Sequence, residues 1–144
     1  MLRRLTSTSS TWATVPLRLA LGIAFIGHGA QKVLGSFNGP GWAKWTSFSQ
    51  MAPFPFMRPA WLWLGAAALA ELIGGILVLL GFFTRVGAFL IVCVMVTAIA
   101  VLWPVFFAPE GMELAVAMLG MALALLITGG GQASVDRMIG GQRR

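Results

Sequence analysis

The sequence contains few charged residues, one cysteine and one histidine. Lysine, arginine, aspartate and glutamate together make up 10% of its 144 residues, whereas soluble domains carry about a quarter. With Cys93 alone, the chain can form neither an internal disulfide nor a C-x-x-C thiol pair. With His28 alone, it supplies neither two histidine ligands for a haem nor a multi-histidine metal site. We therefore expect no metal site and no complete redox centre within this chain.

Apolar residues are abundant and fall into four long runs. Hydrophobic residues make up 58% of the chain, and the runs cover about residues 16–35, 60–83, 85–103 and 112–128. A bilayer core about 30 Å thick needs roughly 20 mostly apolar residues per spanning helix. A chain this short cannot bury so much apolar surface in one water-soluble core. The sequence thus predicts an all-α integral membrane protein, with four transmembrane helices forming a single domain over residues 1–144.

The connection between the first two runs, residues 36–59, is rich in aromatic residues. Trp42, Trp45 and Phe48 repeat at three-residue spacing, with polar residues such as Lys44 between them. This pattern predicts a short amphipathic helix that lies in the outer membrane interface. Anchoring in the interface is the favoured role for these rings. The alternative is a lid over a lipid-soluble ligand, such as a quinone.

The net charge of +6 comes from basic residues that lie mainly beside the apolar runs. This placement indicates membrane topology and lipid head groups rather than nucleic acid as the reason for the charge. One side of the membrane would carry Arg3, Arg4, Arg85, Arg137, Arg143 and Arg144. The other side would carry Lys44, Arg58 and Glu110. The positive-inside rule therefore places both termini, and the tail over residues 129–144, in the cytoplasm.

Several ionisable residues lie within the apolar runs. A charge at the bilayer centre costs about 2.5–3.5 kcal/mol on insertion scales, so each needs a partner or a function. His28 and Lys32 are four residues apart and share a helix face. In antiparallel helices Glu71 falls within about one turn of the depth of His28. We expect Glu71 to pair with His28 or Lys32, Glu113 to join as a second acid, and Arg18 to extend toward the cytoplasmic head groups.

Two interpretations of this polar cluster remain open at the level of the sequence. In the first, the charges form a neutral clasp that fixes the order of the helices. In the second, His28 and Glu71 exchange a proton with a quinone or another small carrier.

Small residues recur at four-residue spacing in the second and fourth runs. The two stripes are Ala66, Ala70 and Gly74, and then Gly120, Ala124 and Thr128. Such stripes let helix backbones approach closely within a membrane, and we interpret both as packing surfaces of the bundle.

A combination of short motifs resembles the DoxX family of small four-helix membrane proteins. The motifs are Arg18-Leu19-Ala20-Leu21-Gly22 with Phe25, His28-Gly29 and Lys32, then Ala70-Glu71-Leu72-Ile73-Gly74-Gly75, Leu80-Gly81, Thr84-Arg85, Glu113, and Gly129 to Gly131 with Ser134 and Asp136. Relatives often carry a basic residue and an aromatic before the serine, where this chain has Gln132 and Ala133. By matching position, the residues of interest are Arg18, His28, Lys32, Glu71, Arg85 and Glu113.

The resemblance implies an integral membrane component of redox metabolism, because DoxD-type relatives are subunits of thiosulfate:quinone oxidoreductase. Our leading hypothesis is an accessory or structural subunit of a membrane redox complex in the bacterial inner membrane. Its partners would be the lipid bilayer and other redox subunits, and not nucleic acid. The alternative is a quinone-binding oxidoreductase subunit with a proton-handling site at His28 and Glu71. The sequence leaves open whether the chain is itself enzymatic, and it names no catalytic residue.

Overall fold

The regular elements of the computed structural model are helices throughout the residues that it describes, 6–109 and 111–140. The long helices are α2 (Thr14–Leu34), α4 (Ala60–Leu80), α5 (Thr84–Leu102) and α6 (Glu113–Thr128). The short ones are α3 (Gly41–Thr46), α7 (Val135–Gly140) and the 3-10 turns η1 (Ser36–Asn38) and η2 (Ser49–Met51). The four apolar runs thus form four helices within a few residues of the predicted limits. Arg3, Arg4, Glu110, Arg143 and Arg144, which entered the topology prediction, lie outside the described residues.

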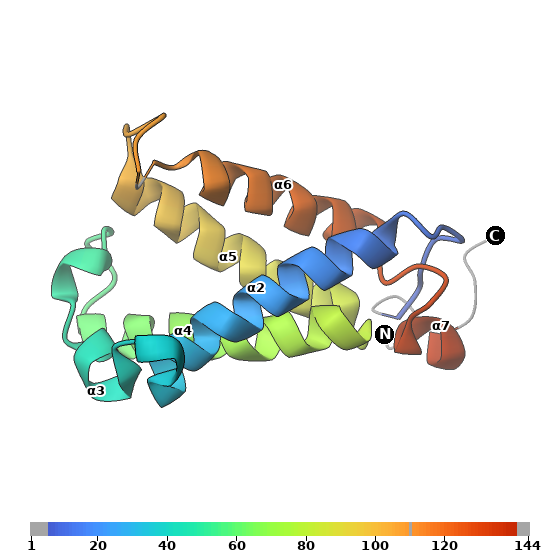
Figure 1. Ribbon diagram of the computed structural model, residues 1–144, viewed down its shortest axis with the longest axis horizontal. Coiled ribbons are helices and arrows are strands. Elements are labelled where there is room, and N and C mark those ends of the chain that lie inside the picture. The colour runs from blue at the N-terminus through green and yellow to red at the C-terminus, as the bar shows by residue number, and fades with distance from the viewer. Residues whose placement is uncertain (1–5, 110, 141–144) are drawn as a thin grey trace.

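The long helices pack in chain order. Helix α2 packs on α4, α4 on α5 and α5 on α6, and α2 also contacts α6 (Figure 1). Helix α4 ends at Gly81, whose φ of +66° is a left-handed conformation that favours glycine, and α5 begins three residues later. This short turn makes α4 and α5 an antiparallel hairpin, as expected. We call the end that holds α3 the loop end, and the end that holds α7 the terminus end (Figure 1).

Glycines allow the backbones of α2 and α4 to approach closely. A Cβ atom on Gly29 would lie 2.6 Å from Leu72 Cα, and one on Gly75 would lie 2.7 Å from Ile26 N. On the other side of α4, a Cβ on Gly74 would lie 3.1 Å from a backbone oxygen of α5. Of the predicted α4 stripe, Gly74 therefore packs closely against α5, whereas Ala66 is exposed and, with Ala70, lines a cavity. The α6 stripe differs, because a Cβ on Gly120 would meet no atom within 4 Å, so Gly120 takes no part in packing within this chain.

A pair of alanine substitutions tests this packing. We expect Gly29→Ala to lower the free energy of unfolding by about 3 kcal/mol, the upper part of the range for overpacking, because the obstacle is backbone. The matched control, Gly120→Ala, should be neutral or stabilise by up to about 1 kcal/mol through helix propensity. Thermal unfolding in detergent, followed by circular dichroism, measures both. Equal melting temperatures for the two variants would contradict the packing argument.

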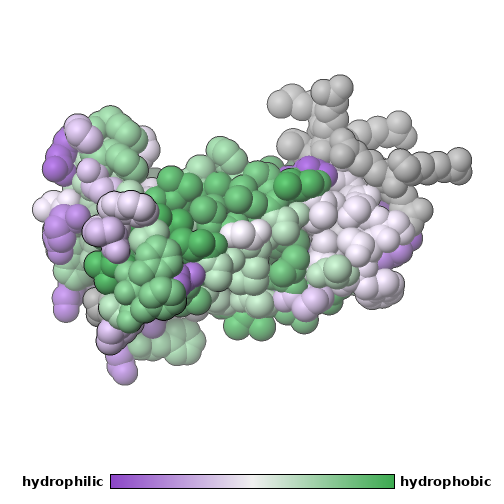
Figure 2. Space-filling model, turned by 90° about the horizontal axis from the view of Figure 1, so that it is seen from above, coloured by the Kyte–Doolittle hydropathy of each residue, from purple (hydrophilic) through white to green (hydrophobic). Residues whose placement is uncertain are grey.

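The surface carries an apolar band. Figure 2 shows apolar residues over the middle of the face in view and more polar residues toward both ends. Large side chains such as Ile23, Ile73, Phe89 and Ile127 are exposed on all four long helices. Among the described residues, α4 and α5 are each long and apolar enough to cross a membrane, and α6 is a shorter apolar helix. This surface suits lipid rather than water.

Candidate functional site

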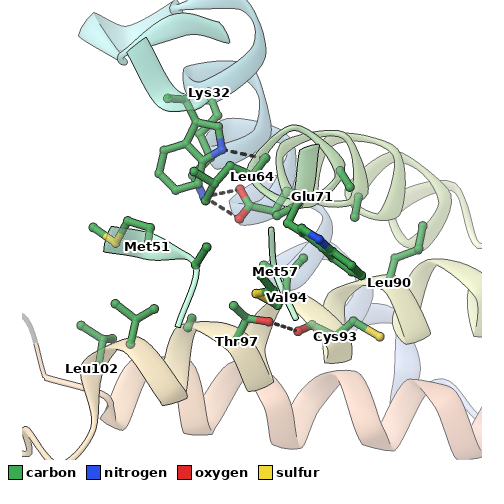
Figure 3. Close-up of a pocket in the computed structure, with 18 residues that line it drawn as sticks. Lys32, Met51, Met57, Leu64, Glu71, Leu90, Cys93, Val94, Thr97 and Leu102 are labelled. Carbon is green, nitrogen blue, oxygen red and sulfur yellow. Dashed lines mark hydrogen bonds and ion pairs between the residues drawn. The ribbon is translucent and has the colours of Figure 1, made fainter. Parts of the chain in front are cut away.

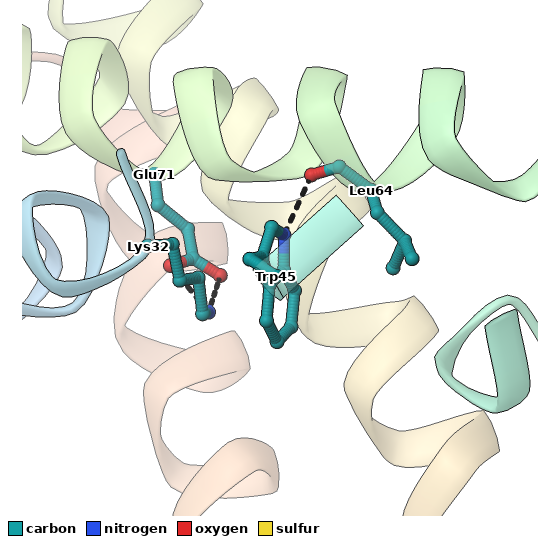
Figure 4. A network of polar contacts seen from close by, with 4 residues as sticks. All are labelled: Lys32, Trp45, Leu64 and Glu71. Atoms are coloured by element: carbon teal, nitrogen blue, oxygen red, sulfur yellow. Dashed lines mark hydrogen bonds and ion pairs between the residues drawn. The ribbon is translucent and has the colours of Figure 1, made fainter. Parts of the chain in front are cut away.

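A buried ion pair joins α2 to α4. Lys32 Nζ lies 2.5 Å and 2.6 Å from the two carboxylate oxygens of Glu71, so the contact is bidentate (Figure 4). The Glu71 side chain is 4% exposed and the Lys32 side chain 19%. The close approach at Gly29, three residues before Lys32, brings the lysine within reach of α4. The prediction that Glu71 pairs with His28 or Lys32 is confirmed, with Lys32 as the partner.

Trp45 of α3 lies against this ion pair. Its indole N–H donates to the carbonyl of Leu64 on α4 at 2.8 Å (Figure 4). Lys32 Nζ lies 4.5 Å from the centroid of the Trp45 ring, which is a cation–π contact. The Phe48 ring meets Trp45 edge-on at 6.0 Å. The predicted short helix is present, and its aromatic face packs onto α4.

Trp42 adds a second contact between α3 and α4. A Cβ on Gly65 of α4 would lie 2.9 Å from the Trp42 ring, so the ring rests against this glycine, although Trp42 remains 42% exposed. The three aromatic residues therefore differ in position: Trp45 and Phe48 are half-buried, and Trp42 reaches the surface.

Next to the ion pair lies a cavity of about 440 Å³. It lies between α4 and α5 and is closed by residues of the connection before α4, among them Met51 and Met57 (Figure 3). Lys32, Glu71 and Trp45 contribute to its lining, and α5 contributes Cys93, Thr97 and several apolar side chains. Small-molecule sites typically measure about 300–1,000 Å³ and are mostly apolar with a few polar groups. This cavity has that size and that character.

The polar groups of the cavity are few and mostly already bonded. The Thr97 hydroxyl donates to the carbonyl of Cys93 at 3.0 Å. The lone pairs of the hydroxyl oxygen can still accept a hydrogen bond from another donor. Glu71 accepts from Lys32 through both oxygens. An ammonium group has three N–H donors, so Lys32 keeps one for a further acceptor. The site therefore suits a ligand with an apolar body and a neutral hydrogen-bond acceptor.

His28 takes no part in the Lys32–Glu71 ion pair and does not line the cavity. It is exposed on α2, and no hydrogen bond or ion pair joins it to any residue in the described part of the chain. Of the two predicted alternatives, His28 is therefore not the partner of Glu71, because Lys32 contacts both carboxylate oxygens and His28 is exposed.

Glu113 does not join the ion pair as a second acid. Its carboxylate accepts from the backbone N–H of Phe107 at 3.2 Å, across the turn that precedes α6. As the first residue of α6, it also carries its negative charge where the helix dipole is positive. Glu113 therefore stabilises a turn and a helix start rather than the cluster.

Arg18 is buried and does not reach the head groups. It is 6% exposed, and its guanidinium donates to the carbonyls of Val78, Leu79, Gly130 and Ala133 at 2.5–3.0 Å. These carbonyls belong to the end of α4 and to the segment after α6. The snorkelling prediction is wrong, because backbone carbonyls inside the protein satisfy the guanidinium.

The sequence analysis missed Asp136, which it left in a polar tail. Asp136 lies in α7 and is 1% exposed. Its carboxylate accepts from the backbone N–H groups of Phe83 and Thr84, at 2.7 Å and 2.8 Å, and from the Thr84 hydroxyl at 2.7 Å. An acid at this place satisfies unpaired N–H groups at the start of α5. The available signal was its place, with Ser134, among the residues on which the resemblance was based.

Arg85 completes the contacts at the terminus end. Its guanidinium donates to the carbonyls of Leu126 and Ile127 at the end of α6, at 2.5 Å and 2.7 Å. Arg18, Asp136 and Arg85 thus tie the terminus ends of the four long helices together, and the cavity lies toward the loop end.

The sequence matches one known family. Residues 13–104, more than half of the chain, match the sequence model of the DoxX family. The chain belongs to the DoxX family. With its two membrane-capable helices in the described residues, this DoxX member is a membrane protein. The match covers α2 to α5, including Arg18, Lys32 and Glu71, and ends before Glu113 and Asp136. No curated protein and no solved structure matches the chain.

Proposed function

We propose that this DoxX protein is a subunit of a membrane redox complex and holds a quinone-like carrier in the cavity between α4 and α5. The observation that carries the proposal is the cavity itself: about 440 Å³ of mostly apolar space with the Lys32–Glu71 pair in its wall. A quinone has an apolar tail and a ring with two neutral carbonyl acceptors. The third N–H of Lys32, which lies beside the Trp45 ring, would offer a donor to one of them.

The proposed setting is a four-span arrangement in a bacterial inner membrane. Helix α2, with 21 residues, is about 31 Å long, and α6, with 16, is about 24 Å long. Helix α2 is close to the thickness of the hydrocarbon core, about 30 Å, and α6 is about 6 Å shorter, a mismatch that local thinning of the bilayer accommodates. Arg85 and Arg137 lie at the terminus end, which the positive-inside rule would place in the cytoplasm. The cavity would then open toward the outer half of the bilayer, beneath α3.

The electrons would come from another subunit. One histidine and one cysteine do not make a redox centre, so this chain would contribute binding and orientation of the carrier. Trp45 would cover the ring of the carrier, which matches the lid interpretation of the aromatic connection. The ion pair takes the place of the expected His28–Glu71 pair as the ionisable group beside the carrier.

The second candidate is a purely structural clasp, favoured by the bidentate geometry of the same ion pair. A clasp needs only Lys32 and Glu71 in contact between α2 and α4. It gives no reason for a cavity of ligand size beside the pair, and for that reason we favour the carrier site.

Cys93 provides the test. It is the sole cysteine, and it is exposed at the edge of the cavity that it lines. A lipid-soluble maleimide can therefore reach it, and a carrier held in the cavity would shield it. Short-chain ubiquinone or menaquinone analogues at ten times their Kd should slow labelling about tenfold. The matched control is Cys93→Ala with Val96→Cys, because Val96 is exposed on α5 and does not line the cavity. Labelling of Cys93 at the same rate with and without both quinones would refute the carrier site.

A further inference from the structure

Helix α2 carries two stripes with the same helical spacing. The first is buried against α4 and the core, and it includes Arg18, Leu21, Phe25 and Gly29. The second consists of Ala20, Ala24, Gly27, His28 and Gln31, at positions i, i+4, i+7, i+8 and i+11. This is the spacing of one packing face of a helix. None of its five residues is buried, and we call it the His28 face.

The His28 face is open over most of its length because α2 and α6 separate toward the loop end; at its last position, Gln31 lies against Gly39 of the same chain. Leu21 is fully buried, whereas His28, two turns further along the same side of α2, is exposed. On α6, Leu125 is fully buried, but Leu114, three turns nearer the loop end on the same side, is 61% exposed. Figure 1 shows α2 leaving α6 and running toward α3. On both α2 and α6, the helix side that faces the core at the terminus end therefore faces outward at the loop end.

Two polar side chains on this face have no partner. No hydrogen bond or ion pair joins His28 or Gln31 to any residue within 6–109 and 111–140. His28 lies six residues before the end of α2, about 9 Å into the helix from the loop end. Polar groups at such a depth in a membrane pair with one another or with neighbouring helices. Lipid tails offer neither donor nor acceptor.

We propose that a second copy of this chain covers the His28 face, with the two α2 helices packed across a twofold axis normal to the membrane. Two copies inserted in the same direction bring the same residue to the same depth, so His28 meets His28 of the second copy. A neutral imidazole has one donor and one acceptor, and an amide has both, so like side chains satisfy each other. The pairing needs no matching group from a foreign helix.

The shape of the face fits this contact. A Cβ on Gly27 would meet no atom within 4 Å, and Ala20 and Ala24 are the other small residues of the stripe. Small residues let two helix backbones approach closely in a membrane. The inference rests on the membrane orientation given under the proposed function, and it is independent of the carrier.

Cysteine cross-linking in native membranes tests the contact. In a Cys93→Ala background, Ala24→Cys places a thiol in the middle of the His28 face. Leu19→Cys is the control, because Leu19 is exposed and lies about 140° away around the helix. Mild oxidation should give an adduct of twice the chain mass with Ala24→Cys and none with Leu19→Cys. Absence of that adduct, equal yields from both positions, or adducts with other proteins alone would overturn the proposal.

A second pair of variants separates the dimer from the fold. Gly27→Leu adds bulk where the single chain has open space, so the chain should fold and its mass after gentle solubilisation should fall from two copies to one. Gly120→Leu adds the same bulk at an open position of α6 and should leave two copies. A Gly27→Leu protein that stays dimeric would overturn the proposal. Quinone protection of Cys93 in the Gly27→Leu monomer is expected to persist, which distinguishes failure of the dimer from failure of the carrier site.

Discussion

Replacing Arg18 with leucine is expected to lower the free energy of unfolding by about 3 kcal/mol or more. Hydrogen bonds to a charged donor contribute about 1.5–3 kcal/mol each, and this guanidinium serves four backbone carbonyls. Its loss leaves buried acceptors at the end of α4 and after α6 without a donor. Chemical or thermal unfolding in detergent, followed by tryptophan fluorescence, measures the loss.

Two controls identify the cause of the Arg18 effect. Arg58→Leu removes an exposed arginine and should change stability by less than about 0.5 kcal/mol. Arg18→Lys keeps the charge but loses the planar fork that reaches several carbonyls at once, so it should recover only a small part of the loss. If Arg18→Leu unfolds with the same free energy as the wild type, the four contacts with backbone carbonyls do not stabilise the fold.

The second large effect is expected at the ion pair, where Lys32→Met should destabilise the fold by about 3–5 kcal/mol. The substitution leaves the Glu71 carboxylate, 4% exposed, without a cation. The double variant Lys32→Met with Glu71→Leu should recover most of that loss, because apolar residues of similar volume often replace a buried pair without cost. A double-mutant cycle of unfolding free energies measures the coupling.

The same double variant separates the two functions considered for the pair. If the pair binds the carrier, the stable double variant should lose most of the quinone protection of Cys93. Lys44→Met, at an exposed position of α3, is the control for loss of a lysine. Additive losses in the cycle would contradict a coupled pair, and full protection in the double variant would favour a clasp.

The limits of the helices were predictable because each apolar run ends at residues that stop helices. Helix α4 begins after Pro59 and ends at Gly81, and both limits follow from backbone chemistry alone. The sequence reduced the partner of Glu71 to two candidates, His28 and Lys32, since depth in a membrane restricts the choice. The sequence could not decide which of these two residues pairs with Glu71. That depends on how α2 is rotated about its axis, and the close contact at Gly29 sets this rotation.

The contacts of Arg18 and Asp136 could not be predicted from local patterns. Arg18 bonds to Gly130, 112 residues away, and Asp136 bonds to Thr84, 52 residues away. Backbone carbonyls and N–H groups occur at every residue, so no side-chain pattern marks those that receive a bond. The cavity was not predicted; a lid was only the alternative role for the aromatic connection, and of its three rings Trp45 alone lines the cavity. The volume of the cavity depends on how far α4 and α5 separate.

The bond from Arg18 to Gly130 also has a consequence for biogenesis. A ribosome makes Arg18 112 and 115 residues before Gly130 and Ala133, so the first helix can enter the bilayer before these two acceptors exist. Until those residues are made, the guanidinium must rely on other partners, such as water or phosphate. The native arrangement of this end is therefore completed only after α6 has been made, when the segment that follows it packs against the first helix.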